Sequence, residues 1–191
     1  MNKELQKYLL ELARNAIAAE LELTKEKIER PKISETELLN EKRGVFVTLE
    51  IDGSLRGCIG NIMPVYPLEN AVKQNAVHAA FEDPRFQPLD FEEFKDVEIE
   101  ISVLSVPKKL EYKNAEDLLK RLEPLRDGVV IKKGYYDATY LPQVWTDLAD
   151  KKQFLSSLCM KAGLPQDEWQ KGELEVLTYR AEVFKEADLL K

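Results

Sequence analysis

Hydrophobic and polar positions recur along the chain with two different periods, and each period predicts a different kind of element. Residues 4–23 carry apolar side chains at helical spacing, which predicts an amphipathic N-terminal helix. Residues 97–103 alternate apolar and polar side chains, which predicts a half-buried strand with one polar face. The apolar positions of that strand are Val97, Ile99, Ile101 and Val103.

Between these elements the sequence predicts a β-hairpin and a second helix. Asp52-Gly53 separates the apolar run 45–51 from residues 55–62, and Asp-Gly between two such runs is a strong hairpin signal. Small residues at helical spacing follow from Leu68 to Ala80, and Pro84 ends that helix. Small side chains let a helix lie close to a sheet, and Gly57 on the inward face of the strand would suit such packing.

The second half of the chain repeats this order of hairpin, proline, helix and strand. Lys133-Gly134 separates two strand-like runs, residues 128–132 and 136–141, and Pro142 follows them. A helix is expected after Asp150, and a final alternating strand over residues 177–183. The parallel predicts structural repeats over residues 43–106 and 126–185. Asn114 is expected to cap the helix that links the two halves.

Composition narrows the classes of function. The 191 residues are 44% hydrophobic and 33% charged, an ordinary balance for a globular chain. A net charge of -7 and a pI near 5.0 disfavour nucleic-acid binding, which normally needs a basic surface. The sequence has no apolar run of about 20 residues and no signal pattern, so we expect a cytoplasmic protein without a membrane segment. One histidine and two distant cysteines disfavour a metal site and a disulfide framework.

The hexapeptide Leu55-Arg56-Gly57-Cys58-Ile59-Gly60 is the strongest candidate site. Strand alternation would place Leu55, Gly57 and Ile59 on a core face and Arg56, Cys58 and Gly60 on the other. A neighbouring arginine favours thiolate, so Cys58 is a candidate nucleophile or ligand contact. The alternative is that Cys58 is a small buried hydrophobic residue, as free cysteines usually are.

Other candidate residues each have a structural alternative. Gly57 and Gly60 could offer backbone N–H groups to an anion held by Arg56, or could serve close packing and a strand bend. Arg85 could contact a ligand or satisfy carbonyls at a helix end. Gln143 is a polar amide among apolar residues and a candidate ligand contact. His78 could pair with Cys58, although a position on the helix surface explains it better.

Five segments of the chain form a set of sequence motifs. They are Leu55-Arg56-Gly57-Cys58-Ile59-Gly60, Asp83-Pro84-Arg85-Phe86, Ile99-Glu100-Ile101-Ser102-Val103-Leu104, Ala138-Thr139-Tyr140-Leu141-Pro142-Gln143-Val144-Trp145, and Phe154-Leu155 through Cys159 to Gly163-Leu164. Together these segments resemble the AMMECR domain family. The resemblance covers nearly the whole chain, and the set of motifs is highly specific. Tyr140 stands where bacterial and archaeal members usually have phenylalanine.

This resemblance implies an α+β fold with antiparallel sheets flanked by helices, in a single domain of two unequal lobes over residues 1–191. It implies that the larger lobe is built from both chain ends and that the signature lines a groove between the lobes. Prokaryotic members are similar to component A of the AmmeMemoRadiSam system. That similarity makes a Memo-like protein and a radical-SAM protein candidate partners. It transfers no proven catalytic residue.

We therefore expect a cytoplasmic protein that binds a small anionic or polar molecule beside Arg56 and Cys58. Arg85 and Gln143 are the expected contacts from the walls of the site. The residues leave open whether the chain is an enzyme, and they specify no cofactor. The alternative is a non-catalytic adaptor whose signature forms a rigid core that presents a surface to a partner protein.

Overall fold

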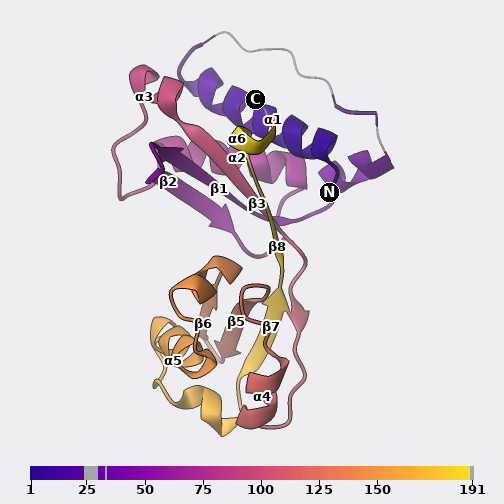
Figure 1. Cartoon of the computed structure of the whole chain (residues 1–191), viewed down its shortest axis with the longest axis vertical. Helices are drawn as coiled ribbons and strands as arrows, with labels where there is room; N and C mark the ends of the chain where they lie inside the picture. The colour runs from indigo at the N-terminus through magenta and orange to yellow at the C-terminus, as the bar shows by residue number, and fades with distance from the viewer. Residues whose placement is uncertain (24–29, 33, 190–191) are drawn as a thin grey trace. The chain divides into compact units, whose positions relative to one another are not determined.

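A computed structural model describes residues 1–23, 30–32 and 34–189 (Figure 1). These residues form two compact units. The first unit runs from Met1 to Leu104 and includes the C-terminal segment from Glu182 onward. The second unit is the intervening segment, Ser105–Ala181. Each unit has its own four-stranded sheet and its own hydrophobic core.

The sheet of the first unit has the strand order β2-β1-β3-β8. Its central strand β1 pairs antiparallel with β2 on one side and with β3 on the other. The strand β2 is therefore an edge strand. The strands are β1 (Gly44–Ile51), β2 (Ser54–Asn61), β3 (Glu98–Leu104) and β8 (Ala181–Lys185).

Helices α1 (Lys3–Glu20) and α2 (Leu68–Phe81) cover one face of this sheet (Figure 1). The small-residue face of α2 lets it approach β2 closely. A Cβ atom added to Gly57 would lie 2.2 Å from the carbonyl oxygen of Ala79, so only glycine fits there. This confirms that Gly57 serves close packing of helix on sheet. The remaining helical segments of this unit are η1 (Ser34–Asn40), α3 (Phe91–Asp96) and α6 (Glu186–Leu189).

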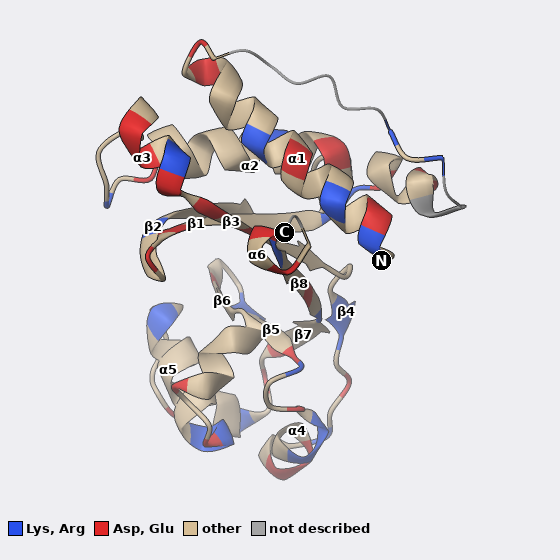
Figure 2. Ribbon diagram, turned by 45° about the horizontal axis from the view of Figure 1, so that its top comes forward, with Lys and Arg blue, Asp and Glu red and all other residues tan. Residues whose placement is uncertain are grey.

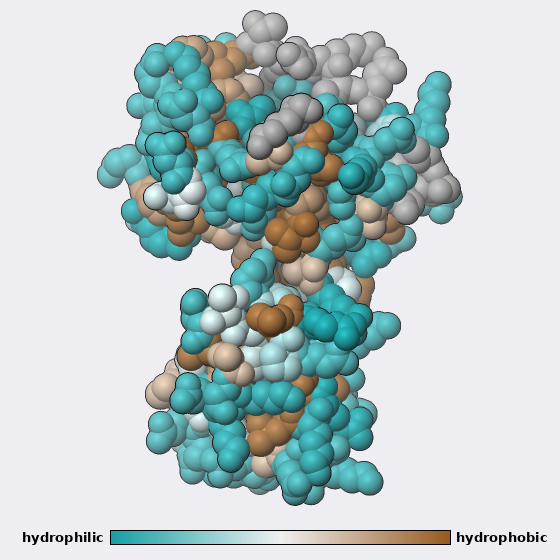
Figure 3. All heavy atoms as spheres, viewed as in Figure 1, coloured by the Kyte–Doolittle hydropathy of each residue, from teal (hydrophilic) through white to brown (hydrophobic). Residues whose placement is uncertain are grey.

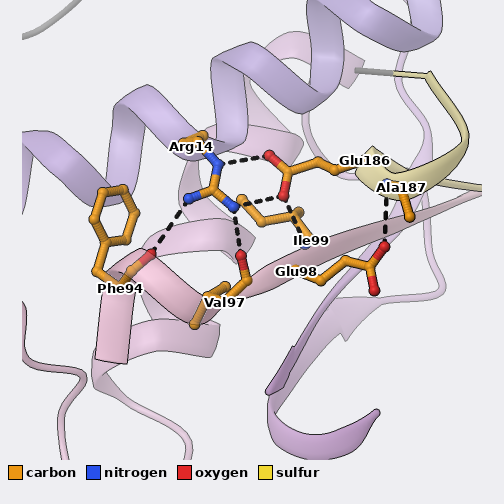
Figure 4. A network of polar contacts seen from close by, with 7 residues as sticks. All are labelled: Arg14, Phe94, Val97, Glu98, Ile99, Glu186 and Ala187. Carbon is orange, nitrogen blue, oxygen red and sulfur yellow. Dashed lines mark hydrogen bonds and ion pairs between the residues drawn. The ribbon is translucent and has the colours of Figure 1, made fainter. Parts of the chain in front are cut away.

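Within the first unit, a partly buried ion pair holds the C-terminal segment in place (Figure 4). Arg14 of α1 donates to both carboxylate oxygens of Glu186, at 2.6 and 2.5 Å, and to the carbonyl oxygen of Val97. Glu186 also accepts the Ile99 N–H at 2.9 Å. Glu98 accepts the N–H of Ala187 at 3.0 Å. Helix α6 is therefore bonded to both α1 and β3.

The second unit contains a sheet of order β4-β7-β5-β6, with a core of aliphatic and aromatic side chains. Trp145 and Phe154 stack at the centre of this core, with ring centroids 3.5 Å apart. The strands are β4 (Lys108–Lys109), β5 (Gly128–Lys133), β6 (Tyr136–Tyr140) and β7 (Glu175–Tyr179), and the helical segments are α4 (Ala115–Arg121), η2 (Pro142–Thr146), α5 (Lys151–Lys161) and η3 (Glu168–Lys171).

The architecture confirms the predicted α+β class with antiparallel sheets and flanking helices. In each sheet the first hairpin strand is central, and the strand that follows the helix pairs beside it, giving β2-β1-β3 and β6-β5-β7. The prediction of one final strand over residues 177–183 is wrong, because this segment contains parts of two strands that are separated by Arg180. The strand β7 belongs to the sheet of the second unit and β8 to that of the first.

Charged side chains of both signs lie along the outer surface of α1, which is the polar face of this amphipathic helix (Figure 2). On the face shown in Figure 3 hydrophilic residues predominate, and hydrophobic ones appear in small groups. None of the described helices combines the length and the apolar composition needed to cross a membrane.

Candidate functional site

A β-bulge in β2 determines how the signature hexapeptide is displayed. Leu49 pairs with Gly57, whereas the next residue, Glu50, pairs with Leu55, so Arg56 is an extra residue without a partner on β1. The bulge moves Leu55 to the face of Glu50, where it is 43% exposed. The prediction that Leu55 lies on the core face with Gly57 is therefore wrong. A single inserted residue reverses the alternation on one side of it.

The peptide group of Cys58 is held on both sides by the turn that follows α2. The Cys58 N–H donates to Asp83 Oδ2 at 2.8 Å, and Arg85 Nη2 donates to the Cys58 carbonyl oxygen at 3.3 Å. Both backbone groups point away from β1, toward the free edge of the sheet. This turn therefore protects an edge strand that would otherwise offer open backbone groups.

The side chain of Cys58 belongs to the sheet face opposite α2. Cys58 pairs with Thr48 of β1, and Thr48 pairs with Glu100 of β3, so the three form one row across the sheet. Thr48 Oγ1 donates to Cys58 Sγ at 3.3 Å. Pairs whose backbone groups point outward bring their side chains closest together, which accounts for this contact. We call the surface formed by Thr48, Glu50, Cys58 and Glu100 the polar face.

Lys185 of β8 supplies a cation at the far side of the polar face. Its Nζ lies 3.0 Å from Glu50 Oε2 and 3.2 Å from Glu100 Oε2. Hydrogen bonding to Glu50 raises the pKa of Lys185, so it stays charged at neutral pH. The polar face thus runs from a thiol and a hydroxyl to a cluster of one cation and two carboxylates.

Asp83 is the buried anchor of this arrangement, since its side chain is only 2% exposed. It accepts hydrogen bonds from Arg85 Nε at 2.9 Å and from Arg85 Nη2 at 2.6 Å, in addition to the Cys58 N–H. The hydrogen bonds from Arg85 outweigh burial and hold the pKa of the Asp83 carboxyl well below its usual range. Asp83 is therefore an anion at any physiological pH.

Arg56 is neutralised by a carboxylate. Its guanidinium donates to both oxygens of Glu93, at 2.8 and 2.7 Å, and to the carbonyl oxygen of Gln87 at 2.9 Å. The hydrogen bond from Arg56 lowers the pKa of Glu93. The ring of Phe86 lies 5.7 Å from Arg56 Cζ and 5.4 Å from Arg85 Cζ, within reach of both cations. Arg56 thus fixes the segment 86–93 against the edge of the sheet.

One nitrogen of Arg56 has no partner. Among the described residues, Arg56 Nη1 is a buried side-chain atom for which no hydrogen-bond acceptor is found. A buried donor without an acceptor is costly, so such an atom calls for an explanation. A ligand oxygen or a water molecule that reaches Nη1 would remove that cost.

The other predicted site residues, Gly60, His78 and Gln143, lie on three different elements. A Cβ atom on Gly60 would lie 2.3 Å from the ring of Phe46, so close packing accounts for this glycine as it does for Gly57. His78 is on α2, where its Nε2 lies 3.8 Å from Glu82, whereas the Cys58 side chain is on the opposite face of the sheet. Gln143 is exposed in η2 of the second unit, and its role as a ligand contact stays a prediction.

The second cysteine is not part of the candidate site. Cys159 is fully buried in the core of the second unit, and burial raises the pKa of its thiol. Its sulfur is therefore enclosed by the core of that unit. No cluster of three or more metal-ligating side chains occurs among residues 1–23, 30–32 and 34–189.

Comparison with known proteins gives the family. A sequence model of the AMMECR1 family matches residues 10–184. The chain belongs to the AMMECR1 family. Protein MK0488 of Methanopyrus kandleri is 43% identical over 95% of this chain and 88% of its own, and Protein PYRAB00100 of Pyrococcus abyssi is 42% identical over 94% and 89%. The crystal structure of the uncharacterized protein PH0010 from Pyrococcus horikoshii superposes with a TM-score of 0.81, at 39% identity, over 97% of this chain and 93% of that one.

In this AMMECR1-family chain, three site residues had escaped sequence reasoning. They are Thr48, Asp83 and Glu93, which contact the signature from β1, from the turn after α2 and from α3. Asp83 carried a signal, because an aspartate before proline marks a turn, but nothing local showed that its carboxylate is buried. Thr48 and Glu93 carried none, since their contacts depend on strand register and on a loop that folds back.

Proposed function

We propose that this AMMECR1-family protein binds a small polar or anionic molecule on the polar face of its first unit, beside Cys58. One observation carries the proposal: the Cys58 backbone is held rigidly by Asp83 and Arg85, while its thiol is only half-buried and lies among polar side chains. A group that contributes only to packing, such as Cys159, has a fully buried sulfur instead.

Two guanidinium groups near Cys58 support an anionic or polar ligand. Arg85 uses Nε and Nη2 to hold Asp83, yet its side chain is 53% exposed. Arg56 contributes Nη1, the buried donor without an acceptor. A charged N–H donor forms stronger hydrogen bonds to carboxylate and phosphate oxygens than a neutral donor does. Cys58 is the contact that would also make the site reactive, as a nucleophile toward an electrophilic ligand.

The proposed biological setting is a pathway shared with a Memo-like protein and a radical-SAM protein, as the family resemblance implies. A pull-down from lysate with the tagged chain, probed for these two protein classes, tests this part separately. If neither protein class is found with the wild-type chain, the proposed pathway is contradicted, but the proposed ligand site is not affected.

A thermal-shift screen of polar and anionic metabolites tests the ligand site. A ligand at one hundred times its Kd adds about 2.7 kcal/mol to the stability of the folded state, which moves the melting temperature by several degrees. We expect Cys58→Ala to retain the melting temperature of the free protein and to lose the shift. Ser54→Ala is the matched control, because Ser54 is exposed at the start of the same strand.

The same screen distinguishes the adaptor alternative. If Cys58→Ala melts far below the wild type while partner binding is unchanged, the signature serves the fold and the adaptor hypothesis gains support. If no metabolite shifts the wild-type protein, the proposal of a small-molecule site is contradicted.

A further inference from the structure

A hollow of about 380 Å³ lies within the second unit, near the start of β5 and the end of β7. Its lining includes Ser105, Lys108, Asp127, Tyr179 and Arg180. All of these residues belong to the second unit, whereas the residues of the polar face belong to the first. Its volume lies within the range of small-molecule sites, which is about 300–1,000 Å³.

One wall of the hollow is rigid, because Tyr179 is fixed at both ends. Its hydroxyl donates to the Tyr140 carbonyl oxygen at 3.1 Å and lies 3.1 Å from the Thr139 hydroxyl. Its ring packs on Gly128, where an added Cβ atom would lie 2.3 Å away. Burial raises the pKa of Tyr179 to about 12, so its hydroxyl is neutral at physiological pH.

Two cations line the same hollow. Lys108 is an exposed residue of β4 that faces Thr178 in register, and Arg180 follows β7 directly. The backbone of Arg180 is fixed, because its N–H donates to Ser105 Oγ at 3.0 Å and its carbonyl oxygen accepts the Ser105 N–H at 2.8 Å. Its guanidinium is 59% exposed and lies 3.8 Å from Glu123, which is longer than a hydrogen bond.

Asp127 adds a carboxylate to the lining of the hollow. The residue is 8% exposed, and its Oδ2 accepts the N–H of Glu123 at 2.7 Å. Its second oxygen, Oδ1, has no hydrogen-bond partner among the described residues. A carboxylate oxygen that no protein donor occupies can accept a hydrogen bond from a ligand that enters the hollow.

We propose that this hollow binds a small molecule that carries a carboxylate or phosphate together with a hydroxyl or amino group. The anionic group would lie between Lys108 and Arg180, and the hydroxyl or amino group would donate to Asp127 Oδ1. Amino acids and hydroxy acids are the simplest members of this class. A plain anion satisfies the two cations but leaves Asp127 without a donor, and it also meets the repulsion of that carboxylate.

Isothermal titration of the full chain with L-serine, L-malate, acetate and inorganic phosphate tests the proposal. We expect L-serine or L-malate to bind more tightly than acetate or inorganic phosphate. Lys108→Met and Arg180→Met should each weaken that binding about tenfold or more, because each removes a charge-assisted hydrogen bond. Asp127→Asn should abolish the preference over acetate. Because Asp127 is nearly buried and its variant can misfold, the two exposed cations carry the decisive comparison.

Arg126→Met is the matched control. Arg126 is an exposed arginine that pairs with Glu123 at 2.5 Å but does not line the hollow, so its loss should leave the affinity unchanged. Equal affinity in Arg180→Met and Arg126→Met would overturn the proposal, as would the absence of binding by all four probes at about 10 mM. Cys58→Ala should bind these probes normally, which separates this site from the polar face.

Discussion

The backbone N–H of Cys58 donates to the buried carboxylate of Asp83 at 2.8 Å, which joins the edge strand β2 to the turn after α2. Arg85 completes the contact, because it holds Asp83 with two nitrogens and reaches the Cys58 carbonyl oxygen with one of them. A strand edge that is normally open is thereby closed by side chains. The thiol of Cys58 gains a fixed position without a further strand beside it.

Replacing Asp83 should destabilise the protein in a pH-dependent way. Asp83→Asn should cost about 2 kcal/mol at pH 7, because the buried carboxylate accepts several hydrogen bonds. The pKa of Asp83 is lowered on folding, so its contribution is present above the unfolded pKa of about 3.9 and is lost as the pH falls. Between pH 5 and pH 3 the difference from the wild type should narrow by about 1 kcal/mol, measured by urea denaturation.

Asp96→Asn serves as the control for this titration, since Asp96 is exposed at the end of α3. It should change stability little at either pH. A difference between wild type and Asp83→Asn that stays constant from pH 5 to pH 3 would contradict the assigned role of the carboxylate.

The pair of Arg56 and Glu93 should be energetically coupled. Because Glu93 is 37% exposed, solvent weakens the ion pair, and we expect a coupling free energy of about 1 kcal/mol. A double-mutant cycle with Arg56→Met and Glu93→Gln, followed by urea denaturation, measures it. A coupling near zero would show that Arg56 does not act through Glu93 and would favour the original expectation of a cation committed to the ligand.

Gly57→Ala should destabilise strongly, because its methyl group would collide with the backbone of α2 at Ala79. We expect a loss of at least about 2 kcal/mol in the free energy of unfolding. Gly134→Ala is the comparison, since Gly134 has φ +60° and open space around its Cα. Its cost should be about 1 kcal/mol, from backbone strain alone. Similar costs for both variants would disprove the close approach of α2 to β2.

Glu186→Ala should loosen the C-terminal segment, because Arg14 and the Ile99 N–H both lose their acceptor. We expect a loss of about 2–3 kcal/mol and faster hydrogen exchange of the Ile99 amide. Glu186→Gln should protect that amide better, since the side-chain oxygen of glutamine still accepts the N–H. Exchange at Ile99 that is unchanged in Glu186→Ala would contradict this account (Figure 4).

Local sequence patterns predicted those helix caps and hairpin turns that depend only on residues close together in the chain. Asn114 and Asp150 cap α4 and α5 as expected, and the turns at Gly53 and Gly134 join the two hairpins. The alternation of apolar and polar residues continues through Arg180, although β7 and β8 belong to different sheets. Alternation predicts a strand but does not specify which other strand pairs with it.

The candidate site was located from sequence, but its chemistry was only partly foreseen. Cys58 lies on a polar surface, as alternation predicted, whereas Arg56 is turned toward Glu93 by the bulge. A bulge depends on the register of two strands, and a partner 37 residues away depends on the course of a loop. Neither is encoded in the spacing of a hexapeptide.

Protection of Cys58 from iodoacetamide tests the proposed ligand site most directly. In the native protein Cys58 should be labelled about tenfold or more faster than the fully buried Cys159, as mass spectrometry of the peptides can show. A metabolite that raises the melting temperature should slow labelling of Cys58 and leave Cys159 unchanged. Labelling of Cys58 at the same rate with and without a saturating metabolite would contradict a ligand site on the polar face.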